Sequence, residues 1–135
     1  MMKRAFLILL LATSAPAVAQ ERPPAERQTL SELAYSLGES HALRQACEGP
    51  ADQYWRDRML RMTQVEDADP GFDAQMRERF NTGYAAGQAA AVGCGPQSRR
   101  AEAAAAARGQ TLARRLSAIM RKTDPPVIGE PQDIN

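Results

Sequence analysis

Cysteine and histidine are scarce in this sequence, and their scarcity excludes several classes of metal and redox protein. The 135 residues include two cysteines and one histidine. Cys47 and Cys94 form neither a C-x-x-C redox motif nor a C-x-x-C-H haem-attachment motif, which excludes a c-type cytochrome. Two thiols and a single imidazole also lack the usual spacing of a zinc site. We therefore expect no metal site and no cofactor.

The sequence also lacks the alternating pattern of a β-strand and, beyond its N-terminus, any long apolar run. The apolar run at residues 5–12 follows Lys3-Arg4 and precedes the cleavage motif Ala17-Val18-Ala19. It is far shorter than the ~20 residues of a membrane-spanning helix and is typical of a secretory signal peptide. We expect cleavage after Ala19, which removes residues 1–19 and leaves a periplasmic protein that does not span the membrane.

Apolar residues recur at helical spacing in several separate stretches. Thr29-Leu30-Ser31-Glu32 is a capping box that predicts the start of the first helix, and Asp52 and Ser98 are good N-caps for two others. The predicted helices cover residues 29–47, 53–65, 72–92 and 98–122. We expect a flexible leader at residues 20–28, a helical domain at 29–122 and a disordered, Pro-rich tail at 123–135.

The disulfide expected between Cys47 and Cys94 constrains the order of these helices. Each cysteine follows a helical stretch and precedes a Gly-Pro stop, and export favours a structural disulfide over a redox-active pair. A disulfide brings the two Cα atoms within about 7 Å, so the first and third helices end at the same pole. Short turns between antiparallel helices place them there as well. The expected fold is all-α: an up-down-up-down four-helix bundle stapled by one disulfide.

Two apolar patterns are expected to form the helix interfaces. Trp55, Met59 and Met62 make one stripe on the second helix. The alternative for these methionines, together with Met76, is a copper(I) site, but an adaptable core face explains them better. Gly83-x-x-x-Gly87 predicts close approach of two helices, while Gly38 is expected to weaken the middle of the first helix.

His41 is the only candidate for acid-base catalysis by an imidazole. No nucleophile elbow accompanies it, and an ordinary partly buried or solvated histidine explains it better. We therefore assign no catalytic residue and expect no enzymatic activity. A small hydrolase that uses His41 is kept as an alternative.

Positive charge is concentrated in the last predicted helix. Residues 20–97 carry eight basic and twelve acidic side chains, whereas residues 98–122 carry seven basic side chains and one acidic. This face is expected to dock an anionic partner, or to be solvated and partly neutralised within the fold. The predicted partner contacts are Arg114, Arg115, Arg121, Lys122 and the region of Trp55. We expect an envelope protein or another anionic envelope component as partner, and no nucleic acid.

Three motifs around the cysteines resemble a known family. These are Leu37-Gly38-Glu39-Ser40-His41 leading to Cys47, Tyr54-Trp55-Arg56, and Phe80-Asn81-x-Gly83-Tyr84 leading to Cys94. Over residues 29–122 the chain is similar to small alphaproteobacterial envelope proteins with two well-separated cysteines, grouped as a domain of unknown function. The resemblance implies export and a disulfide, and it implies no activity or catalytic residue.

The function expected from these observations is that of a periplasmic accessory or interaction protein of the envelope, without catalytic activity. A helical stress or chaperone-like binder is the first alternative, and it requires an exposed apolar concave face. The hydrolase that uses His41 is the second.

Overall fold

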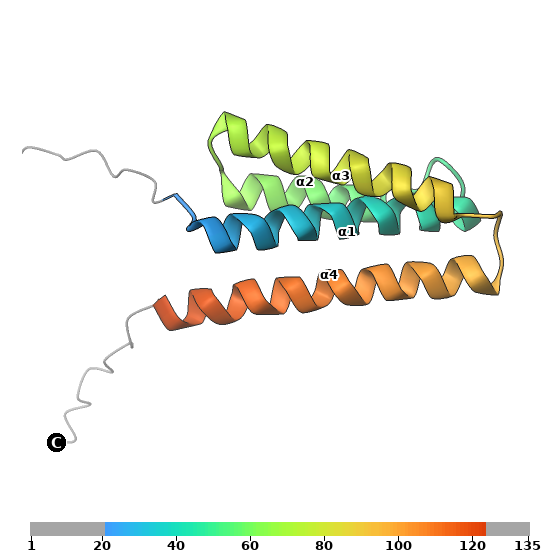
Figure 1. The fold of residues 1–135 in the computed structure, drawn as a ribbon. Coiled ribbons are helices and arrows are strands. Elements are labelled where there is room, and N and C mark those ends of the chain that lie inside the picture. Colours follow the sequence, from blue (N-terminus) through green and yellow to red (C-terminus); the bar gives the residue numbers. More distant parts are fainter. Residues whose placement is uncertain (1–20, 124–135) are drawn as a thin grey trace, which may run out of the picture.

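The fold is all-α, as predicted, with four helices in the part of the chain that the structure describes (Figure 1). The computed structural model describes the backbone of residues 21–123 and the side chains of residues 21–119. The helices are α1 (Pro24–Glu48), α2 (Tyr54–Glu66), α3 (Pro70–Ala90) and α4 (Pro96–Thr123), and residues 21–123 contain no strand. The predicted signal peptide and the predicted tail beyond residue 123 lie outside this range.

Helix α1 is the centre of the domain. It packs against each of the other three helices, and α3 and α4 lie on opposite sides of it (Figure 1). Its buried residues therefore surround the helix and include small polar side chains such as Ser31, Ser36 and Ser40. Small side chains on several faces allow neighbouring helices to approach from several directions.

The core fills the space between α1 and its neighbours. The stripe predicted on α2 is confirmed, because Met59 is 4 % exposed and Trp55 and Met62 pack against the core. Met76 of α3 is fully buried in the same cluster. The buried members of the cluster are Leu30, Leu33, Ala34, Leu37, Met59, Phe72, Met76 and Leu116.

Glycines bring α1 and α3 into backbone contact. A Cβ atom on Gly38 would overlap the carbonyl oxygen of Phe80 and lie 2.8 Å from its carbon. A Cβ atom on Gly83 would overlap the carbonyl oxygen of Tyr35 in the same way, and one on Gly87 would lie 2.6 Å from the carbonyl oxygen of Glu39. The close approach predicted at Gly83 and Gly87 is therefore confirmed. Gly38, for which only a weakening of α1 was predicted, is also part of this contact.

Three helices, α1, α3 and α4, begin earlier than the sequence patterns predict, and each begins at a proline. Helix α1 begins at Pro24, where the fixed φ of proline suits the first helical position. The capping box at Thr29 was therefore wrong: the Thr29 hydroxyl lies inside the helix and donates to the Ala25 carbonyl (3.0 Å). Residues 24–28, predicted as part of a flexible leader, belong to α1.

Helix α4 begins at Pro96 in the same manner, which corrects the N-cap predicted at Ser98. Ser98 is buried within the first turn, and its hydroxyl donates to the Gly93 carbonyl. The cap of α2 is Gln53, and the adjacent Asp52 accepts a hydrogen bond from the Tyr54 N–H (3.1 Å).

The predicted disulfide joins the end of α1 to the segment between α3 and α4. Cys47 and Cys94 are bonded, and their Cα atoms lie 4.7 Å apart. Near the same pole, Arg44 of α1 contacts Asp52 before α2 (3.0 Å) and Glu102 of α4 (3.7 Å). Covalent and ionic links therefore connect the end of α1 with all three other helices at this pole.

Candidate functional site

The outer face of α4 carries exposed arginines that have no ion pair within the described part of the chain. Arg99 lies 4.0 Å from Glu48, and Arg108 lies 2.6 Å from Glu39, so these two charges are neutralised within the domain. Arg100, Arg114 and Arg115 are exposed, and none makes an ion pair with any residue of the described range. Internal neutralisation therefore explains only part of the basic helix. The other two predicted contacts, Arg121 and Lys122, lie in the last turn of α4, beyond the described side chains.

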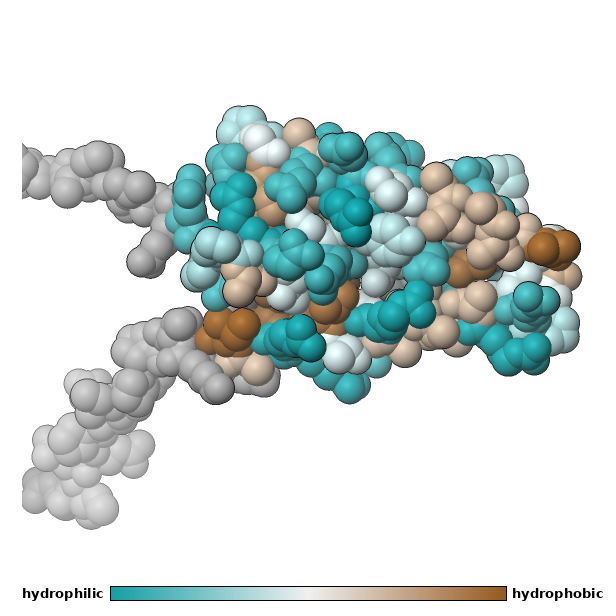
Figure 2. Space-filling model, viewed as in Figure 1, coloured by the Kyte–Doolittle hydropathy of each residue, from teal (hydrophilic) through white to brown (hydrophobic). Residues whose placement is uncertain are grey.

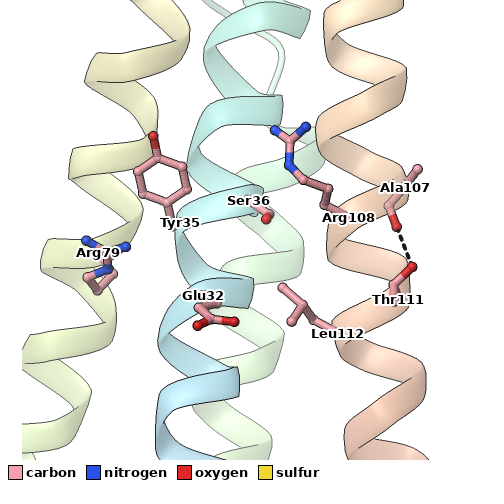
Figure 3. A pocket seen from close by; sticks show the side chains of 8 residues that line it. All are labelled: Glu32, Tyr35, Ser36, Arg79, Ala107, Arg108, Thr111 and Leu112. Carbon is pink, nitrogen blue, oxygen red and sulfur yellow. Dashed lines mark hydrogen bonds between the residues drawn. The ribbon is translucent and has the colours of Figure 1, made fainter.

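A groove of about 540 Å³ borders this face, between α3 and α4 and over α1 (Figure 3). Tyr35 of α1 and Arg79 of α3 form one wall, where the guanidinium lies 5.0 Å from the centre of the phenol ring. Arg108, Thr111 and Leu112 of α4 form the other wall. Arg115 follows Arg108 by seven residues, which places both on nearly the same side of α4. Glu32 of α1 lies between these walls, so the groove carries charges of both signs and the excess of positive charge stays on the outer face of α4.

Trp55 is a packing residue at the junction of α2 and α4. Its ring is half-buried against the core, and its Nε1–H donates to Glu102 of α4 (3.0 Å). The exposed edge of the junction carries Tyr54, whose ring stacks under Arg58 at 3.5 Å. The single acidic residue of α4 is therefore used to hold α2 and Arg44, which leaves the outer arginines without a carboxylate on their own helix.

His41 is buried between aromatic rings on the side of α1 that faces α3. It is 5 % exposed, and its ring centre lies 5.9 Å from that of Phe80 and 5.4 Å from that of Tyr84. Its Nδ1 is buried and has no hydrogen-bond partner among residues 21–119. The neighbouring Ser40 hydroxyl donates to the Ser36 carbonyl at 2.8 Å, so it is not bonded to the imidazole. The described residues thus contain no nucleophile or carboxylate hydrogen-bonded to His41.

Burial gives His41 a pH-dependent effect on stability. Desolvation lowers the pKa of His41, and the charge of Arg56 lowers it further, while Asp52 and Asp57 oppose this shift. Protonation therefore favours the unfolded chain, in which histidine has a pKa of about 6.5. The contribution of the neutral ring to the free energy of unfolding is fully present above about pH 6.5. It is lost as the pH falls through the pKa of His41 in the folded protein.

We therefore expect the urea midpoint of the protein to fall between pH 7.5 and about pH 5.5. The His41→Phe variant keeps an aromatic ring at this position and should lose less stability over the same range. The backbone N–H of Phe72 lowers the pKa of Asp69, so this carboxyl titrates below the window. Parallel curves for the two proteins would contradict the assignment.

Sequence reasoning missed the residues that gather around these sites from different helices. The hydroxyl of Tyr84 donates to Gln45 at 2.7 Å across 39 positions of sequence, and Arg108 reaches Glu39 across 69. No local motif marks such pairs, because their members share a face only after the helices pack. The one available signal was the aromatic and glycine spacing of α3, which indicates the face turned towards α1.

Two further properties concern metals and membranes. No three histidine, cysteine, aspartate or glutamate residues in the described range come close enough together to hold a metal ion. Within the same range, none of the helices combines the length and the apolar character needed to cross a membrane.

Comparison with known proteins identifies the family and no relative of established role. No curated protein and no solved structure matches the sequence. A family model matches residues 24–119, which is most of the chain and includes both cysteines, His41 and all four helices in whole or in large part. The chain therefore belongs to the family described as Protein of unknown function (DUF2385).

Proposed function

We propose that this protein is an exported, non-catalytic interaction protein of the periplasm that docks an acidic envelope protein on the outer face of α4. One observation carries the proposal: Arg100, Arg114 and Arg115 are exposed and have no ion pair within the described range, although the other two described arginines of α4 do. Unpaired guanidinium groups on one straight helix suit bidentate contacts with carboxylates of a partner.

The composition of this face favours a protein over a lipid surface. A helix that inserts into the membrane interface carries bulky apolar residues beside its basic ones. The large apolar side chains that are most exposed in the described range are Tyr54, Leu60, Val65 and Val92, and none of them lies on α4. Between its arginines α4 exposes small side chains such as Ala104 and Ala107, which allow close approach of another protein.

Export and the alternating direction of the helices are part of the proposal. The disulfide between Cys47 and Cys94 supports an oxidising compartment and hence cleavage of residues 1–19. Contacts near both ends of α1 support the up-down-up-down order. Arg22 bonds Glu66 at the end of α2, and Cys47 is bonded to Cys94 just after α3.

The two alternative functions, a chaperone-like binder and a hydrolase that uses His41, have less support. A chaperone-like binder requires one broad apolar face, but the view in Figure 2 is mostly hydrophilic, with small separate apolar patches. A hydrolase requires a nucleophile positioned by its base, and the nearby Ser40 is bonded to the Ser36 carbonyl instead.

Photo-cross-linking from α4 in living cells tests the proposal. A photoreactive phenylalanine replaces Thr111, an exposed residue one turn before Arg115. We expect an adduct with one acidic envelope protein. Its yield should fall about tenfold or more in Arg114→Gln/Arg115→Gln, because each lost charged hydrogen bond weakens binding by about 1.5–3 kcal/mol. The N-terminus of the recovered protein should be Gln20.

Arg56→Gln/Arg77→Gln removes the same charge from α2 and α3 and serves as the matched control. Its adduct yield should equal that of the parent protein. Equal yields in the two double variants, or adducts formed with lipid alone, would overturn the proposal.

A further inference from the structure

A second pocket lies on another side of the domain, between α2 and α3 and over the last turns of α1. Its volume is about 510 Å³, which is within the usual range for sites that bind small molecules. Helix α2 makes few contacts with α3, so the two helices form walls over α1 without closing on each other. The residues that line the pocket are His41, Gln45, Pro50, Gln53, Arg56, Met59, Leu60, Thr63, Arg77, Phe80, Asn81 and Tyr84.

The charged groups of this pocket all have one sign. Arg56 comes from α2 and Arg77 from α3, and no carboxylate lines the pocket. Arg77 uses its Nε–H to bond Asp73 at 2.9 Å, and its terminal nitrogens have no hydrogen-bond partner in the described range. Among the described side chains, Arg56 has one hydrogen bond, which is long at 3.5 Å and goes to Gln53. Within the described range, Arg56 has no ion pair. Arg77 is ion-paired with Asp73 but keeps its terminal nitrogens as donors to an anionic group.

The remaining lining is divided between apolar and neutral polar groups. Met59, Leu60 and the ring of Phe80 offer an apolar surface. The Tyr84 hydroxyl already donates to Gln45, which fixes the ring that stacks near His41. The pocket therefore offers an apolar surface and polar groups together, which suits a small organic ligand that has both an apolar and a polar part.

His41 provides the independent sign that this pocket takes a ligand. The side chain lines the pocket, is 5 % exposed, and has a buried Nδ1 without a partner. A buried polar atom that lacks a hydrogen bond costs about 1–3 kcal/mol, so such atoms are rare without a functional reason. The imidazole lies beside the rings of Phe80 and Tyr84, which line the same pocket.

We propose that this pocket binds a small amphipathic anion, with its apolar chain against Met59, Leu60 and Phe80 and its carboxylate between Arg56 and Arg77. The site does not depend on the docking face of α4, because the two share no residue. The domain thus has two proposed sites: this pocket for a small anion, and the outer face of α4 for a protein partner.

Titration of the mature, oxidised protein with decanoate, followed by NMR, tests this proposal. His41 is the only histidine, so its imidazole signals need no assignment. We expect saturable shifts of the His41 and Tyr84 ring signals at millimolar decanoate or below. Decanol has the same apolar chain without the charge and should bind about tenfold more weakly or worse.

The two double arginine variants distinguish this site from the face of α4. Arg56→Gln/Arg77→Gln should weaken decanoate binding about tenfold or more, whereas Arg114→Gln/Arg115→Gln should leave it within about twofold. All four side chains are exposed, so both variants are expected to keep the far-UV circular dichroism of the parent. Equal affinity for decanol, unchanged affinity in Arg56→Gln/Arg77→Gln, or the absence of saturable His41 shifts would overturn the proposal.

Discussion

Replacement of Gly83 by alanine is expected to lower the free energy of unfolding by at least about 2 kcal/mol. The new methyl group would overlap the carbonyl oxygen of Tyr35 and lie 2.8 Å from its carbon. The obstacle is backbone inside α1, so no side-chain rotation relieves it. Overpacking costs about 1–3 kcal/mol and occasionally more, and an overlap with rigid backbone belongs at the upper end of this range, while the better helix propensity of alanine contributes only about 1 kcal/mol. The packing cost therefore dominates.

Gly109→Ala is the matched control, because it also replaces a buried helical glycine that faces α1. A Cβ atom there meets Leu33 and Ser36 at 3.5 Å, which is ordinary van der Waals contact. This variant should be as stable as the parent protein or more stable by up to about 1 kcal/mol. Urea unfolding followed by circular dichroism measures both variants. If Gly83→Ala matched Gly109→Ala in stability, α1 and α3 would not be in backbone contact at this position.

This pair of glycines also illustrates what a sequence can reveal about the fold. The spacing of Gly83 and Gly87 predicts a close helix contact, since small residues four apart form a flat strip on one side of a helix. The pattern contains no information on the partner helix. Gly38 completes the contact from α1, and its role is recognisable only when Phe80 is seen against it. Local periodicity therefore predicts faces, and packing decides which faces meet.

Helix boundaries were predicted less well for a related reason. Thr29 and Ser98 have the residue types of N-caps, but Pro24 and Pro96 begin their helices earlier. A threonine inside a helix can donate to the carbonyl four residues before it, as Thr29 does, so its presence does not specify a cap. Residue type was ambiguous at these positions, and the preceding proline was the better signal.

The candidate sites depend on tertiary structure to an even greater degree. The excess of arginine in residues 98–122 is visible in the sequence, but its division into paired and unpaired charges is not. Arg108 is neutralised by Glu39 of α1, whereas Arg114 is not paired within the described range. The pocket of His41 was missed altogether, because Arg56 and Arg77 come from two helices whose separation is set by their packing on α1.

Loss of the disulfide is expected to have the largest effect on stability. The bond between Cys47 and Cys94 closes a segment with a sequence separation of 47 residues. In the chain-entropy model, closing a loop of that length in the unfolded chain contributes about 4 kcal/mol. This is a large part of the roughly 5–15 kcal/mol that stabilises a typical domain. Cys47→Ser/Cys94→Ser should therefore shift the urea midpoint far below that of the oxidised protein.

The reduced parent protein provides the control for the serine variant. Reductant should lower the midpoint of the parent to that of Cys47→Ser/Cys94→Ser and should leave the variant itself unchanged. An unchanged midpoint on reduction would contradict a stabilising disulfide.

Loss of the disulfide is also expected to loosen one part of the fold, the start of α4, in addition to lowering overall stability. Helix α3 stays in contact with α1 through its glycines, whereas the contacts of the start of α4 with α1 include the bonded segment, Glu102 and the ion pair of Arg99 with Glu48. Amide exchange after reduction should therefore accelerate more in the first turns of α4 than in α3 beside Gly83. Uniform acceleration would indicate that the disulfide acts on the unfolded chain alone. A gradient along α4 would show that it also fixes the helix that carries the proposed docking face.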